Sequence, residues 1–138
     1  LVRRVQVVRA VTGPWGEMLA WVEGHTGADA VFLTPPYMED FRIGAQRAIV
    51  VDFKSFAFGD RDALEWERRL MAVTGGARFA LRGDRWAELR AGYASLSNAA
   101  AVQTGRAYGA DYVVREATQP LALPVAYQNP GWTVYRLR

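Results

Sequence analysis

The run Ala48-Ile-Val-Val-Asp-Phe-Lys-Ser55 constrains the fold of this chain more than any other segment. Its apolar residues are mostly β-branched and no polar residue interrupts them, which predicts a buried strand. Asp52 and Lys54 stand two residues apart, so an extended chain directs both side chains to the same face. Lys54 is also the only lysine among the 17 basic residues. The end of this strand is therefore a candidate site.

Short apolar runs and segments of helical period fill the rest of the chain. Runs bounded by Gly, Pro or Asn predict strands at 29–33 and 111–114, a shorter one at 78–81, and a closing hairpin of 123–128 and 132–137. Apolar residues at helical spacing predict helices that begin near Gly13, Met38, Asp60, Asp84 and Leu96.

The helical apolar faces are expected to be buried. In the helix that begins near Asp60, the predicted stripe consists of Leu64, Trp66, Leu70 and Met71. Trp15, Trp21 and Trp86 lie on similar faces of other helices, and we expect them in the core as well.

This order of elements predicts an α/β fold, a three-layer sandwich around a mixed sheet. The early strands are expected to be parallel because helices connect them, and the C-terminal antiparallel hairpin would form an edge. A length of 138 residues fits a single α/β domain over residues 1–138, with residues 1–12 as a lead-in from a preceding segment.

Composition excludes several classes of site. Without cysteine there is no disulfide or thiolate metal site, and a single histidine, His25, argues against a histidine-rich metal site or a Ser-His-Asp triad. No Gly-x-Gly-x-x-Gly or P-loop pattern occurs, so no cofactor is expected. The net charge of +3 is carried by scattered arginines, and nucleic acid is not favoured as a partner.

The candidate site combines polar residues that follow neighbouring strands. Thr34 would end one strand and Ser55 the next, at the sheet edge where open α/β folds bind ligands. In this interpretation Arg42 and Lys54 meet an anionic group and Asp52 orients them. The full predicted site is Thr34, Arg42, Arg47, Asp52, Lys54 and Ser55. A structural alternative pairs Asp52 with Arg42 or Arg47 and leaves Lys54 in solvent.

An enzymatic alternative is a magnesium-dependent nuclease. Asp52-Phe-Lys54 resembles the Asp/Glu-x-Lys element of restriction-endonuclease-like nucleases, with Glu39 or Asp40 as the upstream acid. Carboxylate oxygens would hold Mg²⁺ and the lysine would orient or deprotonate the attacking water. Acid-x-lysine triplets are common by chance, and acids near a helix start are favoured by the helix dipole alone.

Several blocks of residues together resemble a known kind of protein. They are Asp29-Ala-Val-Phe-Leu-Thr-Pro-Pro36, Arg47-x-Ile-Val-Val-Asp-Phe-Lys-Ser-Phe56, Tyr108-Gly-Ala-Asp-Tyr-Val-Val114 and Trp132-x-Val-Tyr-Arg-Leu137. The pattern is similar to the soluble C-terminal, extracytoplasmic domain of an uncharacterised family of bacterial multi-span membrane proteins. Those proteins resemble glycosyltransferases that use lipid-linked sugars.

The resemblance implies an accessory domain without a catalytic site of its own. It implies that the domain is tethered on the extracytoplasmic side of the bacterial inner membrane, with the membrane part of the parent chain as its partner. The start at Leu1 without a signal peptide fits an excised segment of a longer protein, and the basic residues Arg3, Arg4 and Arg9 suit a position beside anionic lipid headgroups. The expected function is to bind or position a ligand, with an anionic ligand as a candidate, or a partner near the membrane surface.

Overall fold

The computed structural model describes residues 13–38, 40–51, 60–75 and 85–138. The helices are α2 (Gly13–His25), α3 (Phe41–Ala45), α4 (Asp60–Val73), α5 (Arg85–Ala94) and α6 (Asn98–Tyr108). The strands are β1 (Val31–Leu33), β2 (Ala48–Ile49), β3 (Tyr112–Glu116), β4 (Val125–Gln128) and β5 (Trp132–Arg136).

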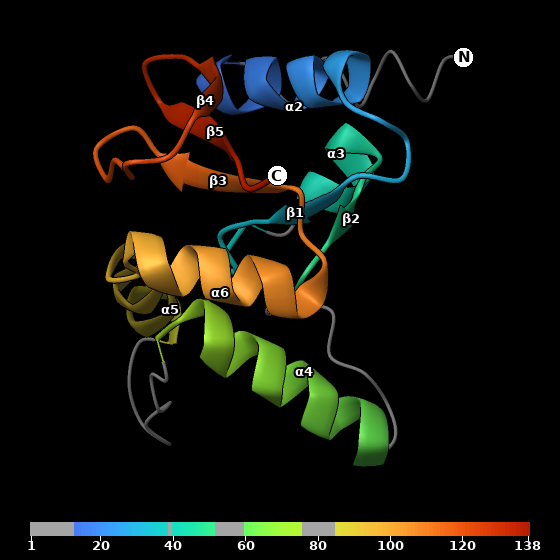
Figure 1. Ribbon diagram of the computed structural model, residues 1–138, viewed down its shortest axis with the longest axis vertical. Helices are drawn as coiled ribbons and strands as arrows, with labels where there is room; N and C mark the ends of the chain where they lie inside the picture. The colour runs from blue at the N-terminus through green and yellow to red at the C-terminus, as the bar shows by residue number, and fades with distance from the viewer. Residues whose placement is uncertain (1–12, 39, 52–59, 76–84) are drawn as a thin grey trace.

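The strands form one mixed sheet in the order β2-β1-β3-β5-β4. β1 pairs in parallel with both β2 and β3, whereas β5 pairs antiparallel with β3 and β4. In Figure 1, α2 lies on one side of this sheet and α4, α5 and α6 lie on the other. The predicted three-layer α/β fold, with parallel early strands and a C-terminal antiparallel hairpin, is confirmed.

Each face of the sheet has its own apolar core. On the α2 and α3 face, buried side chains include Met18, Val22, Phe32, Phe41 and Val134. On the other face, Leu33 and Val113 of the sheet pack with residues of the facing helices, namely Leu70, Val73, Leu89 and Tyr93. Alternate residues of one strand therefore serve opposite cores, as Phe32 and Leu33 do, because successive side chains of a strand point to opposite faces.

The predicted helices are present, with differences at their ends. Ser97 caps α6 through a hydrogen bond that its Oγ accepts from the Ala100 amide at 3.1 Å, and Gly109 ends it in the left-handed conformation at φ 69°. The helix expected from Met38 begins only at Phe41. The strand expected at 78–81 and the helix start expected near Asp84 lie outside the described residues.

The predicted buried faces of α4 and α5 are wrong in part. Leu70 of α4 is fully buried, but Leu64 is 55% exposed and Met71 is 37% exposed. Trp86 of α5, expected in the core, is 44% exposed. Both helices lie in an outer layer of the sandwich (Figure 1). Each buries only the narrow face that packs toward the sheet. Among the described helices, none is both long and apolar enough to cross a membrane.

Candidate functional site

The strand order reverses at β1. The chain runs from β1 to β2 on one side and then crosses back through α4, α5 and α6 to β3 on the other side of β1. In open α/β sheets, ligands bind beyond the carboxyl ends of the strands where such a reversal occurs. The carboxyl ends of β1 and β3 are therefore the first place to examine.

Tyr93 of α5 fastens these two strand ends together. Its hydroxyl donates to the Val114 carbonyl of β3 at 2.6 Å and lies 3.3 Å from the Leu33 carbonyl of β1. The side chain is completely enclosed, and this burial raises the pKa of its hydroxyl above the ordinary tyrosine value. Tyr93 therefore acts as a neutral hydrogen-bond donor that fixes α5 over the edge of the sheet.

Arg115 is a buried cation that holds the end of α5. The residue is 2% exposed, and its guanidinium donates to the carbonyls of Tyr93 at 2.6 Å and Ala94 at 3.0 Å. It also donates to the Gln119 carbonyl at 3.3 Å. Helices end with carbonyls that have no partner within the helix, and a cation there is favoured. We assign Arg115 a structural role: it joins α5 to the segment that follows β3.

A chain of four polar side chains begins at Arg90 of α5. The Arg90 guanidinium lies over the Tyr37 ring, 5.0 Å from its centroid. The Glu116 carboxylate lies near the Tyr37 hydroxyl, and Gln119 Nε2 donates to Glu116 Oε2 at 3.2 Å. Burial, and then the Glu116 charge, raise the pKa of Tyr37 above its ordinary range. The Tyr37 hydroxyl thus remains protonated, and the Arg90 guanidinium packs over its ring.

Two buried oxygen atoms at this edge lack hydrogen-bond partners among the described residues. They are Thr34 Oγ1, just after β1, and Gln119 Oε1, just after β3. An unpaired buried acceptor is costly, so such atoms mark places where a water or a ligand can complete the hydrogen bonding.

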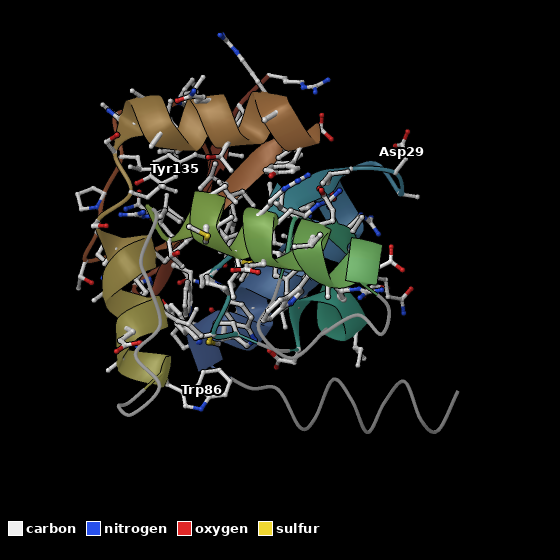
Figure 2. All side chains as sticks on the ribbon, turned by 90° about the horizontal axis from the view of Figure 1, so that it is seen from below. Asp29, Trp86 and Tyr135 are labelled. Carbon is white, nitrogen blue, oxygen red and sulfur yellow. The ribbon has the colours of Figure 1, made fainter. Side chains whose placement is uncertain are left out.

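A shallow groove of about 500 Å³ lies between α5 and the segment after β3. From α5 the lining includes three alanines, Arg90 and the half-exposed Trp86, and Gln119 contributes from the segment after β3. In Figure 2, Trp86 lies at the edge of the molecule, far from Asp29. The full lining is Trp86, Ala87, Arg90, Ala91, Ala94 and Gln119. A groove of this kind combines a flat aromatic face, a cation and an amide.

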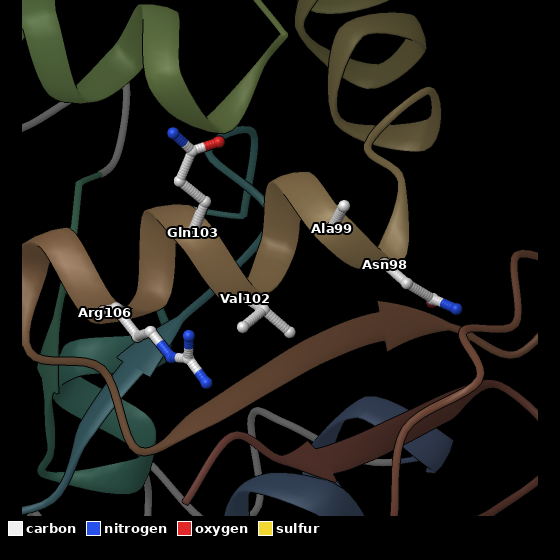
Figure 3. Close-up of a pocket in the computed structure, with 5 residues that line it drawn as sticks. All are labelled: Asn98, Ala99, Val102, Gln103 and Arg106. Carbon is white, nitrogen blue, oxygen red and sulfur yellow. The ribbon is translucent and has the colours of Figure 1, made fainter.

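A second hollow lies along α6 and is lined by that helix alone (Figure 3). Its lining residues are Asn98, Ala99, Val102, Gln103 and Arg106. Asn98 already accepts a hydrogen bond from the Ala122 amide at 2.9 Å, and the remaining lining is mainly apolar. This surface does not converge on any buried polar group and is a weaker candidate.

The residues predicted from the sequence do not all meet at one edge. Thr34 lies at the carboxyl end of β1, as expected, and is fully buried. Arg42 lies on α3 and is exposed. Arg47 immediately precedes β2, and β2 is parallel to β1, so Arg47 lies at the opposite, amino end of the sheet.

Arg47 has a structural set of contacts in this position. Its guanidinium donates to the carbonyls of Glu23 and Thr26 at 2.9 Å each, and its Nε donates to the Thr26 hydroxyl at 3.1 Å. These groups lie at the end of α2 or just after it, so Arg47 fastens that end of α2 to the entry of β2.

The remaining predicted residues, Asp52, Lys54 and Ser55, lie outside the described residues, as does Glu39. Asp40 is described, and its carboxylate accepts the Trp15 indole N–H at 3.0 Å and 3.2 Å. Within the described ranges, no group of three or more His, Cys, Asp or Glu side chains is arranged to hold a metal ion.

Sequence reasoning missed Arg90, Glu116 and Gln119. One signal was available in the sequence. Arg115 and Glu116 follow the apolar run Tyr112–Val114, as Asp52 and Lys54 follow the apolar run of residues 48–51. The role of Arg90 had no such signal: it depends on α5 lying over the carboxyl end of β1.

The fold and the groove together define an α/β domain with a candidate ligand-binding edge. A family model described as a domain of unknown function, DUF6798, matches residues 13–73, which is less than half of the chain. The matched part runs from α2 to the end of α4, so the groove residues lie beyond it. No curated protein and no solved structure matches this chain.

Proposed function

We propose that this chain is a non-catalytic accessory domain that binds an anionic ligand in the groove beside α5. The observation that carries the proposal is the convergence of Arg90, Trp86 and Gln119 at the carboxyl edge of the sheet. Arg90 is exposed, yet its guanidinium is held over the Tyr37 ring, so less conformational freedom is lost when it meets an anion.

The chemistry of the lining supports binding over catalysis. The groove is lined by one tryptophan, three alanines, one arginine and one glutamine. None of these types is a usual general acid, general base or nucleophile at neutral pH. Glu116, the carboxylate of the network beside the groove, accepts a hydrogen bond from Gln119 Nε2 at 3.2 Å.

We further propose that the domain works beside a membrane, on the extracytoplasmic side, with the membrane part of a parent chain as its partner. The support for this step is the resemblance of the sequence blocks to such domains, together with the positive net charge. A basic domain is attracted to anionic headgroups, which would keep the groove close to ligands at the membrane surface.

The magnesium-dependent nuclease remains an alternative that no observation on the described residues favours. Its central pair, Asp52 and Lys54, lies outside those residues, and Asp40 bonds Trp15. A Mg²⁺ titration of the chain followed by NMR decides it: localised shifts at Asp52, Lys54 and Asp40 would support the nuclease and call for DNA cleavage assays.

The binding proposal is tested by titrating the ¹⁵N-labelled chain with inorganic phosphate at constant ionic strength. We expect saturable shifts of the Trp86 indole N–H and of amides in α5 and residues 117–120. Arg90→Gln should abolish these shifts. Arg68→Gln removes an exposed arginine of α4 and is the matched control, which should bind as the unsubstituted chain does. Shifts that survive in Arg90→Gln would refute the assigned site.

A further inference from the structure

The dimensions of the groove restrict the kind of ligand that it can hold. Trp86 and Arg90 are four residues apart on α5, which places them about 6 Å apart along the helix axis. A ligand that contacts both must therefore carry its negative charge close to the group that stacks on the tryptophan.

The remaining lining residues add two further requirements. Ala87, Ala91 and Ala94 have only methyl side chains, so a ring can approach the helix closely. The opposite side is formed by Gln119, whose Oε1 is buried without a hydrogen-bond partner among the described residues. When the Gln119 amide turns toward the groove, this oxygen gains a donor from the ligand, in exchange for the 3.2 Å bond from Gln119 Nε2 to Glu116.

We infer that the groove binds an acidic sugar, a single pyranose ring that bears a carboxylate directly, as in a uronic acid. This inference rests on the proposed binding function and specifies its ligand class. The C–H face of the ring stacks on Trp86, since the negative face of an indole attracts weakly positive C–H groups. The carboxylate meets the Arg90 guanidinium, which suits a planar two-oxygen anion. A ring hydroxyl donates to Gln119 Oε1.

A nucleotide fits these requirements less well. Its base would stack on Trp86, but a ribose separates the base from the phosphate, whereas Arg90 lies only one helical turn away. Simple anions lack a ring that could stack on Trp86, and neutral sugars lack a negative charge that could pair with the Arg90 guanidinium.

The test compares four probes by NMR titration of the 138-residue chain at constant ionic strength: glucuronate, glucose, acetate and uridine monophosphate. We expect glucuronate to bind at least fivefold more tightly than each of the other three, with shifts at the Trp86 indole and at residues 117–120. Acetate binding as tightly as glucuronate would overturn the sugar class and leave the anion-binding function standing. Equal binding of glucose would overturn the acidic requirement, and tighter binding of uridine monophosphate would overturn the single-ring ligand.

A pair of variants separates stacking from charge recognition. Trp86→Ala should weaken glucuronate binding about tenfold while leaving the phosphate-induced shifts of α5 in place. Leu64→Ala removes a similarly exposed apolar side chain from α4 and should change neither. If Trp86→Ala binds glucuronate normally, the acidic-sugar inference fails although the anion site persists. If no probe, phosphate included, changes the NMR signals of the groove residues, the proposed function itself fails.

Discussion

At the scale of single residues, Tyr93, which hydrogen-bonds the strands beside the groove, should make the unfolding free energy of the protein depend on pH in the alkaline range. The unfolded chain releases the Tyr93 proton as pH rises through the ordinary pKa of 10.0, whereas burial raises the folded pKa and keeps the hydroxyl protonated. The stabilisation is complete below pH 10 and falls above it, by about 1.4 kcal/mol per pH unit.

Tyr93→Phe should remove this part of the pH dependence. At pH 8 the variant should also lose about 1–3 kcal/mol of unfolding free energy, because the buried Val114 carbonyl loses its 2.6 Å donor. Urea unfolding between pH 8 and pH 11 measures both effects. An unchanged slope above pH 10 in the variant would show that Tyr93 ionises in the folded chain.

Arg115 gives a second prediction at the residue scale. Arg115→Lys keeps the charge but cannot reach the separate carbonyls of Tyr93, Ala94 and Gln119 at once, so we expect a loss of about 2 kcal/mol. The exposed Arg106 of α6 provides a control, and Arg106→Lys should change stability by less than about 0.5 kcal/mol. Chemical denaturation of both variants checks the difference, and equal stabilities would contradict the assigned role of Arg115.

Only part of the site was predictable at this scale. Thr34 was placed correctly because a proline pair must end the strand before it. Arg47 was assigned to the same edge, yet it enters β2 and lies at the other end of the sheet. Tyr37 and Arg90 are distant in sequence and meet only through the packing of α5, which no local pattern encodes.

At the scale of elements, local signals were sufficient where a helix has its own start and stop. The Ser97 cap and Gly109 mark α6 in the sequence, and the Asn129-Pro-Gly131 turn marks the hairpin. The amphipathic reading of α4 was less successful: the helix buries Leu70 and Val73 but leaves Leu64 exposed. Periodicity identifies a helix, but the width of its buried face depends on neighbours that the sequence does not reveal.

The contact between α4 and α5 depends on Gly92. A Cβ added there would lie 2.8 Å from both the Thr74 carbonyl oxygen and Thr74 Cβ, and a backbone atom cannot move aside cheaply. Gly92→Ala should therefore destabilise the protein by about 1–3 kcal/mol, although alanine is the better helix former. By displacing α5, it should also weaken phosphate binding in the groove.

Gly24 of α2 is the matched control for that substitution. A Cβ at Gly24 would meet no atom within 4 Å, so Gly24→Ala should be neutral or stabilising by up to about 1 kcal/mol. Thermal and urea unfolding of the two variants measures the contrast. A stable Gly92→Ala protein would mean that α5 can move away from Thr74 at little cost.

At the scale of the whole molecule, the sheet joins two cores that otherwise share no helix. β5 lies between β3 and β4, and its consecutive residues Val134 and Tyr135 enter opposite cores. The sequence predicted the hairpin and the layers but not this strand order, because pairing of β3 with β5 is a long-range choice among several topologies that local patterns allow equally.

Because β1, β3 and β5 contribute to both cores, neither layer of helices can lose its packing without exposing strands that the other layer needs. We therefore expect the whole chain to unfold in a single transition. The five tryptophans test this, since Trp15, Trp21 and Trp132 belong to the α2 face, whereas Trp66 and Trp86 lie on α4 and α5. In a Trp66→Phe, Trp86→Phe double variant, fluorescence reports the α2 face alone and circular dichroism reports all helices. The two midpoints in urea should coincide; a fluorescence transition that precedes the loss of helix would show that the α2 layer unfolds first, while the layer bearing the groove remains folded.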